Sequence, residues 1–115
     1  MQMLDIRTFI PSKDYETSKA FYQALGFSCS DASEDLSIFQ NGSCTFFLQR
    51  YYNEEFANNL MLQLIVADIK EAFALISSLQ GFDIRYRPIQ QEHWGKVIYL
   101  WGPAGELWHV TQLNQ

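Results

Sequence analysis

Basic residues and cysteines are scarce in this sequence. Its 115 residues include 8 Lys and Arg against 13 Asp and Glu, which gives a formal net charge of −5. Nucleic acids and anionic membranes are bound by clusters of basic side chains, and the sequence contains no such cluster. Its two cysteines, Cys29 and Cys44, match neither a disulfide framework nor a zinc-binding spacing. We therefore expect no nucleic-acid partner, no membrane partner and two reduced thiols.

Long apolar runs are also missing. Residues 1–7, MQMLDIR, have neither the basic start nor the apolar core of a signal peptide. No later apolar stretch approaches the length of a membrane span, so the expected location is the cytoplasm. Hydrophobic residues make up 48% of the chain, which suffices for a core of its own. We expect a single domain over residues 1–115.

One pattern of strands and helices occurs twice. In the first half, strand patterns lie at 4–10, 28–29, 37–40 and 44–51, with an amphipathic helix at 14–25. In the second half, strand patterns lie at 60–66, 83–87, 96–101 and 106–112, with a helix at 68–80. Asp14 and Asp68 begin the two helices, and Gly26 and Gly81, each followed by Phe, end them. This internal repeat predicts an α+β fold of two tandem βαβββ modules, residues 1–55 and 56–115, which form a cupped mixed sheet with one helix covering each module.

Two short motifs carry a family resemblance. The first is SKAFYQALGF at 18–27, in which Phe-Tyr is followed by Leu-Gly-Phe at the end of a helix. The second joins WG at 94–95 to GELW at 105–108. Together with the repeat, these motifs resemble the vicinal oxygen chelate superfamily, which includes glyoxalase I, extradiol dioxygenases, fosfomycin-resistance enzymes and bleomycin-resistance proteins. The resemblance covers the whole chain and is greatest to the metal-free bleomycin-resistance type.

The resemblance also implies where a metal would be held. Metal-dependent members take ligands, typically His and Glu, from the first and last strands of each module. Motif spacing gives Arg7, Met61 and His109 as three of the corresponding positions here, and strand alternation gives Gln49 as the remaining one, which no motif anchors. A guanidinium is always charged and a thioether is a poor ligand for the divalent metals of these enzymes, so this set lacks suitable donors. The resemblance therefore implies no metal and no cofactor in this chain.

Strand alternation places most candidate ligand-binding residues on one face. The concave face is expected to carry Arg7, Phe9, Phe47, Gln49, Tyr51, Met61, Gln63, Ile65, His109 and Thr111, opposite a helix-packed face that includes Ile6, Ile10, Phe46 and Trp108. From this face and from the aromatic residues near the C-terminus, the candidates for ligand contact are Arg7, Phe47, Gln49, Tyr51, Met61, Gln63, Trp94, Trp101 and His109. Aromatic rings with a few hydrogen-bonding groups are typical of small-molecule pockets, and dimer interfaces have the same makeup.

The main candidates each have a second interpretation. His109, the one catalytic candidate, is either a ligand-contacting or acid/base residue or a histidine that is merely hydrogen-bonded within the cavity. Arg7 either recognises a carboxylate or phosphate or forms an internal ion pair. Trp94, Tyr99 and Trp101 either stack on an aromatic or cationic ligand or fill a core or subunit contact. The segment 51–59 is either a flap over the cavity or a plain linker.

The leading functional prediction is a metal-independent small-molecule-binding protein of the glyoxalase/bleomycin-resistance type. We expect a homodimer whose clefts sequester a small hydrophobic or cationic molecule, such as an antibiotic, and so confer antibiotic resistance. One alternative is a metal-dependent or His109-assisted lyase or transferase similar to glyoxalase I, and another is a non-catalytic interaction module. The sequence contains no nucleophile elbow, phosphate loop or Cys/His pair that would favour covalent hydrolysis.

Overall fold

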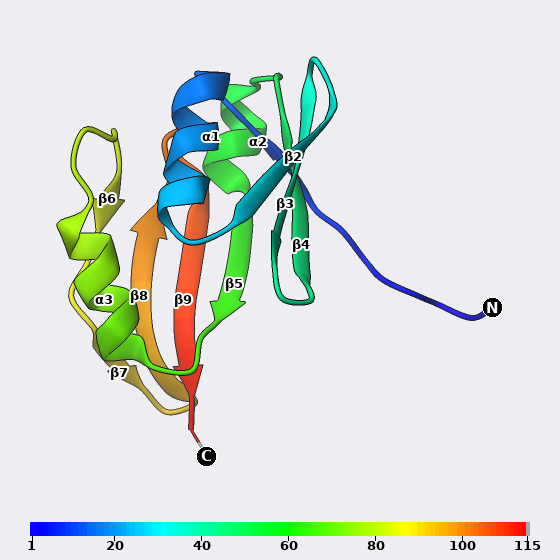
Figure 1. The fold of residues 1–115 in the computed structure, drawn as a ribbon. Helices are drawn as coiled ribbons and strands as arrows, with labels where there is room; N and C mark the ends of the chain where they lie inside the picture. The colour runs from blue at the N-terminus through cyan, green and yellow to red at the C-terminus, as the bar shows by residue number, and fades with distance from the viewer. Residues whose placement is uncertain (115) are drawn as a thin grey trace.

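The chain folds into two modules of the same α+β plan (Figure 1). The structure is a computed structural model and describes residues 1–114. The first module contains β1 (Phe9–Pro11), α1 (Tyr15–Ala24), β2 (Ser28–Ser33), β3 (Leu36–Asn41) and β4 (Cys44–Gln49). The second contains β5 (Met61–Ile65), α3 (Ile69–Ser78), β6 (Arg85–Tyr86), β7 (Gln90–Glu92), β8 (Gly95–Trp101) and β9 (Leu107–Leu113). A short helix, α2 (Glu54–Asn59), links them, and the predicted α+β fold class is confirmed.

Each module forms its own sheet. Sheet A has the strand order β1-β4-β3-β2, and sheet B has the order β5-β9-β8-β6 with β7 also paired to β8. In both sheets the first strand of the module runs parallel to the last, and the other neighbours are antiparallel. The two modules therefore repeat one topology. Within residues 1–114 no ladder joins sheet A to sheet B, so the predicted cup consists of two separate sheets.

The same local signals start both long helices. The carboxylate of Asp14 accepts a hydrogen bond from the backbone N–H of Thr17 at 3.2 Å, and that of Asp68 accepts one from Lys70 at 3.0 Å. Acceptors at this position satisfy N–H groups that a helix leaves unpaired at its first turn. After α1, Gly26 has a φ of 115°, a conformation that residues with a side chain rarely adopt. These signals place α1 and α3 at equivalent points of the two modules.

One hydrophobic core is shared by both modules. Sheet A and α1 contribute Ile10, Phe21, Tyr22, Phe39, Phe46 and Leu48, and sheet B and α3 contribute Ile69, Ile76, Ile98, Leu100, Trp108 and Val110. Contacts cross between the modules, since the ring centroids of Tyr22 and Trp108 are 5.8 Å apart and those of Phe21 and Phe82 are 5.6 Å apart. The inner face of each sheet therefore points into this core, and the opposite face, called the outer face below, points away from it.

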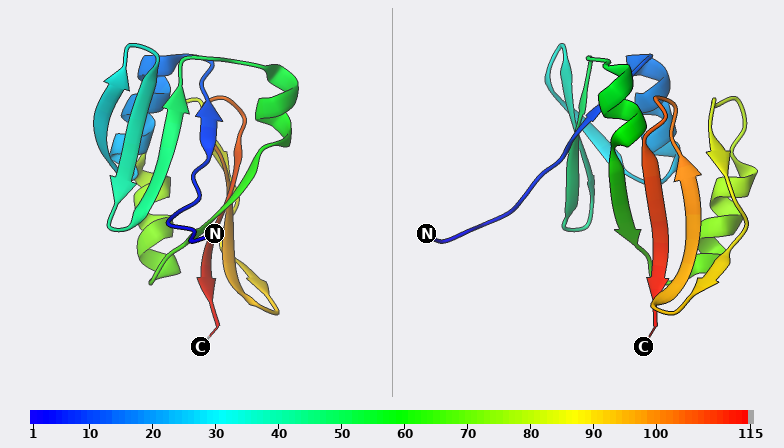
Figure 2. Two further views of the ribbon diagram at one scale, coloured as in Figure 1. Left: turned by 90° about the vertical axis from the view of Figure 1, so that its right-hand side faces the viewer. Right: turned by 180° about the vertical axis from the view of Figure 1, so that it is seen from behind.

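The N-terminal strand is shorter than predicted. The sequence pattern gives a strand over residues 4–10, but β1 begins at Phe9, and residues 1–8 form an extended arm that leaves the body of the molecule (Figure 2). A strand needs hydrogen-bonding partners, and the arm makes one backbone hydrogen bond to the rest of the described chain, from the N–H of Phe47 to the carbonyl of Thr8. Ile6, which was predicted to face the core, is 92% exposed. A single chain thus leaves its arm open to solvent.

The segment between the modules contains a helix that the sequence pattern did not reveal. Helix α2 begins after Asn53, whose side chain accepts the N–H of Phe56 at 2.8 Å, and its Ala57 is buried. A helix this short shows little apolar periodicity, which explains why it was interpreted only as a flap or a linker. None of the helices in residues 1–114 is long and apolar enough to cross a membrane.

Candidate functional site

The outer face of sheet B presents two open rows of side chains. The strand register aligns Met61, Leu107, Trp101 and Arg85 in the first row, and Gln63, His109 and Tyr99 in the second. Arg87 extends the second row, because its backbone N–H donates to the carbonyl of Tyr99 at 3.0 Å. Side chains in one row are close enough to interact across the strands. In the next row, Thr111, predicted for the concave face, is 0% exposed, although its neighbour Ile65 is 49% exposed.

The second row supplies hydrogen-bonding groups next to an aromatic pair. The His109 imidazole stands edge-on to the Tyr99 ring, with centroids 4.9 Å apart and planes at 81°. Both side chains are half-buried, and Gln63 beside them is exposed. Among residues 1–114 no hydrogen bond orients the imidazole, whereas a catalytic base is normally held by a further group. This row is therefore better suited to contact a ligand than to transfer a proton.

The first row ends in a cluster of one indole and two guanidinium groups. The Cζ atom of Arg85 lies 4.6 Å from the centroid of the Trp101 ring, and that of Arg87 lies 5.4 Å from it. Such stacking is favourable and leaves the N–H edge of a guanidinium available for other partners. Within residues 1–114 neither arginine forms an ion pair with a carboxylate. The edge of this face therefore carries two guanidinium groups beside the indole, although the chain as a whole is acidic.

The outer face of sheet A carries a smaller group. Phe9 and Phe47 are paired in register, and their ring centroids are 4.9 Å apart. Arg7 lies over Phe47 at 5.6 Å from the ring centroid, and its Nε donates to Oδ2 of Asp5 at 3.1 Å. This hydrogen bond lowers the pKa of the Asp5 carboxyl below its ordinary value. Of the two interpretations of Arg7, the structure shows an ion pair within the chain, on the exposed arm. Gln49 follows Phe47 on the same face and is half-buried.

The predicted single face is divided between the two sheets. Phe47 and Gln49 lie on sheet A, whereas Met61, Gln63, Trp101 and His109 lie on sheet B. Because the inner faces of both sheets share one core, their outer faces do not oppose each other. The right-hand view of Figure 2 shows this, since sheet B presents its outer face to the viewer while sheet A is seen nearly edge-on. Within one chain the two groups do not form opposing walls of a cleft.

Two of the predicted candidates lie away from both groups, and two residues were missed. Tyr51 follows the end of β4, and Trp94 lies in the turn between β7 and β8, where its ring packs on His93 with centroids 4.8 Å apart. Arg85 and Arg87 were not singled out from the sequence. Their spacing could have identified them, because Arg85 and Arg87 are two residues apart in a strand and therefore share a face.

A buried carboxylate network fixes the strand that carries His109. The carboxyl of Glu106, at 0% exposure, accepts the Tyr22 hydroxyl at 2.6 Å and the N–H of Ala104 at 2.9 Å. The indole N–H of Trp108 in turn donates to the Tyr22 oxygen at 2.9 Å. Burial raises the pKa of Glu106 above its ordinary value. The network ties α1 to the start of β9 and is closed to a ligand.

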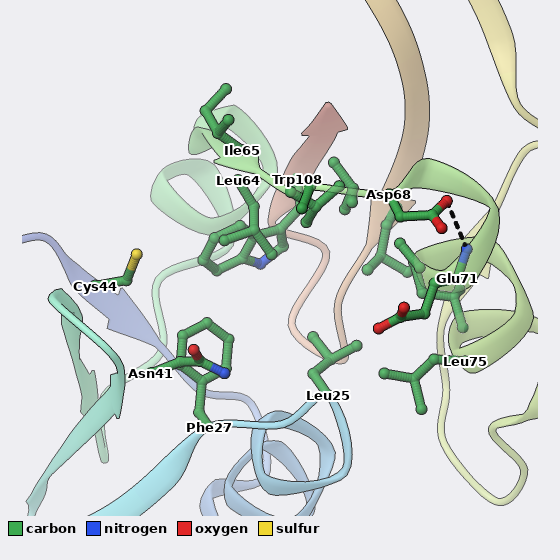
Figure 3. Close-up of a pocket in the computed structure, with 16 residues that line it drawn as sticks. Leu25, Phe27, Asn41, Cys44, Leu64, Ile65, Asp68, Glu71, Leu75 and Trp108 are labelled. Carbon is green, nitrogen blue, oxygen red and sulfur yellow. Dashed lines mark hydrogen bonds between the residues drawn. The ribbon is translucent and has the colours of Figure 1, made fainter. Parts of the chain in front are cut away.

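A hollow of about 590 Å³ lies between the modules on the inner side of sheet B (Figure 3). Its apolar walls include Leu25, Phe27, Leu64, Val66, Leu75, Ile76, Trp108 and Val110, and its polar members include Asn41, Asp68 and Glu71. Its size is in the range of small-molecule sites. None of the residues predicted for ligand contact lines it. Several of its walls are core side chains, so the folding of the chain already accounts for their apolar character.

The residues at the four family metal positions do not fit a divalent metal. Arg7 and Gln49 are on the side of sheet A, and Met61 and His109 are on sheet B. A guanidinium offers no lone pair, and a thioether binds hard and borderline metals weakly. In residues 1–114 no three side chains of His, Cys, Asp or Glu gather as a metal site requires. The metal independence of the chain stays a prediction.

Comparison with known proteins identifies the fold. No family model matches the sequence, and no curated protein matches it either. Among solved structures, a bleomycin-binding protein from bleomycin-producing Streptomyces verticillus, complexed with copper(II)-bleomycin, matches with a TM-score of 0.82 and 17% identity over 99% of both chains. A bleomycin resistance determinant encoded on a transposon matches with a TM-score of 0.81 and 21% identity over 98% of this chain and 100% of its own. This chain has the fold of the vicinal oxygen chelate superfamily.

The vicinal oxygen chelate fold also occurs in enzymes. A lactoylglutathione lyase from Agrobacterium tumefaciens matches with a TM-score of 0.73 and 14% identity, over 97% of this chain and 95% of its own. The same scaffold thus carries binding proteins and catalysts, and the side chains on its sheets decide between them.

Proposed function

We propose that this chain binds a small aromatic molecule without a resident metal, in a cleft that forms between two copies of the chain. The observation that carries the proposal is the division of the candidate residues between two outer faces that do not oppose each other. In a dimer, Phe47 and Gln49 of one copy would form one wall, and Trp101 and His109 of the other copy would form the opposite wall. Similar structures include proteins that bind bleomycin, which supports a ligand-binding role for the scaffold.

The exposed arm provides a physical reason for a second copy. Met1, Met3, Leu4 and Ile6 are each at least 80% exposed, and so many exposed apolar side chains on one short segment favour an interaction site. Each Å² of it that is removed from water contributes about 25 cal/mol. Strand β5 lies at an open edge of sheet B and carries no charged residue, so it can accept a further strand. We therefore propose a homodimer in which the arm of one copy covers apolar surface of the other.

Binding is favoured over catalysis by the chemistry of sheet B. Its open rows contain rings, an amide and guanidinium groups, and their one candidate acid/base group is the imidazole of His109. A single imidazole beside Tyr99, with no group that orients it in residues 1–114, is a weak acid/base device. Sequestration of an antibiotic is the biological role that we propose. An enzyme similar to glyoxalase I is the alternative, and turnover of a hemithioacetal would favour it.

Deletion of the arm tests the proposal. Sedimentation equilibrium of the full-length protein should give a dimer, and a variant without residues 1–8 should be monomeric at the same concentration. Titration with 2-naphthamide, a neutral aromatic probe, should quench tryptophan fluorescence in the dimer and have little effect on the monomer. The expected reason is that the monomer presents only one wall of the cleft.

A matched pair of variants controls for the loss of apolar surface. Ile6→Gln changes an exposed apolar side chain on the arm and should weaken the dimer. Leu75→Gln changes one on α3, in the wall of the inner hollow and away from the arm, and should leave the dimer intact. A full-length monomer that binds the probe as tightly as a dimer would contradict the cleft between copies. A stable dimer that binds no small molecule would favour the interaction module instead.

A further inference from the structure

We infer that the outer face of sheet B selects an aromatic molecule with an anionic substituent, such as a carboxylate. This inference rests on the proposed function, because it takes this face as one wall of the ligand cleft. It differs from the small hydrophobic or cationic molecule expected from the sequence, although an anionic ligand would bind a chain whose net charge is −5. Net charge averages over the whole surface, whereas recognition depends on the groups that face the ligand.

The first step is the placement of both arginines on the ligand side of the sheet. Arg85 pairs with Trp101 in the register of β6 and β8, so their side chains share a face. Arg87 is two residues farther along, and its N–H bonds to the carbonyl of Tyr99. Tyr86, between them, instead packs on Phe73 of α3, with ring centroids 5.9 Å apart. The alternation therefore points both guanidiniums outward, beside the aromatic row.

The second step is that these two charges lack a carboxylate partner within residues 1–114. Arg50 shows the contrast, because its Cζ stacks on Tyr15 at 4.2 Å while its Nε pairs with Asp35 at 3.3 Å. Asp83 and Glu54 line a hollow with Arg85 but form no ion pair with it. Guanidinium groups that stack on a ring and form no ion pair keep N–H edges that match a carboxylate in geometry and charge.

The third step is the aromatic surface next to the charges. Trp101, Tyr99 and His109 form a strip of rings along the two open rows, and these rows contain no carboxylate. A planar ring of a ligand can stack on this strip. Its anionic substituent would then reach the N–H edges of Arg85 and Arg87 at the end of the rows. The arrangement favours an aromatic anion and repels an aromatic cation.

The test uses three probes that share one ring system and differ in charge: 2-naphthoate, 2-naphthamide and 2-naphthamidine. Full-length ¹⁵N-labelled protein is titrated, and the indole N–H signals of Trp94, Trp101 and Trp108 are followed by NMR. Trp101 reports on the outer face of sheet B, Trp108 on the inner hollow and Trp94 on the β7–β8 turn. We expect 2-naphthoate to shift the Trp101 signal and to bind about tenfold tighter than 2-naphthamide, because its hydrogen bonds to arginine are charge-assisted.

Matched arginine variants decide the outcome. The double variant Arg85→Gln/Arg87→Gln should lose about tenfold in affinity for 2-naphthoate and little for 2-naphthamide. Arg50→Gln also removes a stacked guanidinium, but away from this face, and should change neither affinity. An unchanged 2-naphthoate affinity in the double variant, or equal binding of 2-naphthamidine at Trp101, would overturn the inference. If the inference is overturned but 2-naphthamide still shifts the Trp101 signal, the proposed function stands. If none of the three probes shifts the Trp101 signal, the inference and the proposed function both fail.

Discussion

Two regions of this molecule have opposite character, although both flank sheet B. The inner hollow has a volume of about 590 Å³, apolar walls, and Asp68 and Glu71 among its polar members. On the outer face, Trp101 and Arg85 line only a smaller hollow of about 250 Å³, but the face aligns Trp101, Tyr99 and His109 beside two guanidiniums that form no ion pair within residues 1–114. The hollow of about 590 Å³ and the aligned aromatic and basic side chains are therefore on opposite sides of the same sheet.

The difference follows from how the two modules meet. Because α1 and α3 bring the inner faces of both sheets into one core, the space left between the modules is lined by side chains that folding requires. The outer faces carry the polar and aromatic groups that folding does not require. A hollow thus forms where packing is incomplete, whereas the outer face becomes one wall of a cleft in the dimer that we propose.

Substitution of the two tryptophans of sheet B should give the largest difference in unfolding free energy between the two regions. Trp108 is 4% exposed, and its indole N–H donates to Tyr22, so Trp108→Ala should cost about 3–5 kcal/mol of unfolding free energy. Trp101 is half-buried on the outer face, so Trp101→Ala should cost less than about 1 kcal/mol and should abolish 2-naphthoate binding. Urea unfolding followed by circular dichroism measures both losses. Equal losses would show that the outer face is also part of a core.

Substitution of Glu106 should change the free energy of unfolding by a smaller amount, and this change should depend on pH. Burial raises its folded-state pKa above the ordinary value of 4.5, so the folded protein binds this proton more tightly than the unfolded chain does. Its contribution to stability is therefore complete below pH 4.5 and is lost as the pH rises through the raised pKa. The advantage of the parent over Glu106→Gln should be about 1 kcal/mol in acid and should shrink toward neutral pH. If urea unfolding gave the same difference in free energy between the two proteins at every pH, the raised pKa would be contradicted.

Local signals made the fold predictable from the sequence, and non-local pairing explains what was missed. Asp14 and Asp68 cap their helices through contacts within one turn, so the repeat was visible without a structure. The extent of β1 was not, because a strand over residues 4–10 needs a neighbour that one chain does not supply. The alternating pattern assigned Ile6 to the core, but within one chain no neighbouring strand pairs with this segment, so the Ile6 side chain is exposed.

The candidate site was predictable where alternation within one strand sufficed. Gln63 and His109 were assigned to one face, and the register of β5 and β9 places them side by side. Arg85 and Arg87 were missed because their role depends on the pairing of β6 with Trp101, which joins distant parts of the sequence. The division of the predicted face into two also depends on long-range packing, since periodicity gives the face of a strand but not how two sheets are oriented.

The last prediction compares the two regions through their response to metal, and no effect is expected. After incubation with Zn²⁺, Ni²⁺ or Mn²⁺ and desalting, mass spectrometry should find far less than one ion per chain, and the Tm should not change. The outer face repels cations through Arg85 and Arg87, and in the hollow the Asp68 carboxylate already accepts the N–H groups of α3. A retained ion that is lost in His109→Ala would place a metal on the outer face and favour an enzyme similar to glyoxalase I. An ion lost instead in Asp68→Asn would place it in the hollow, which would make the inner side of sheet B the site of cation binding.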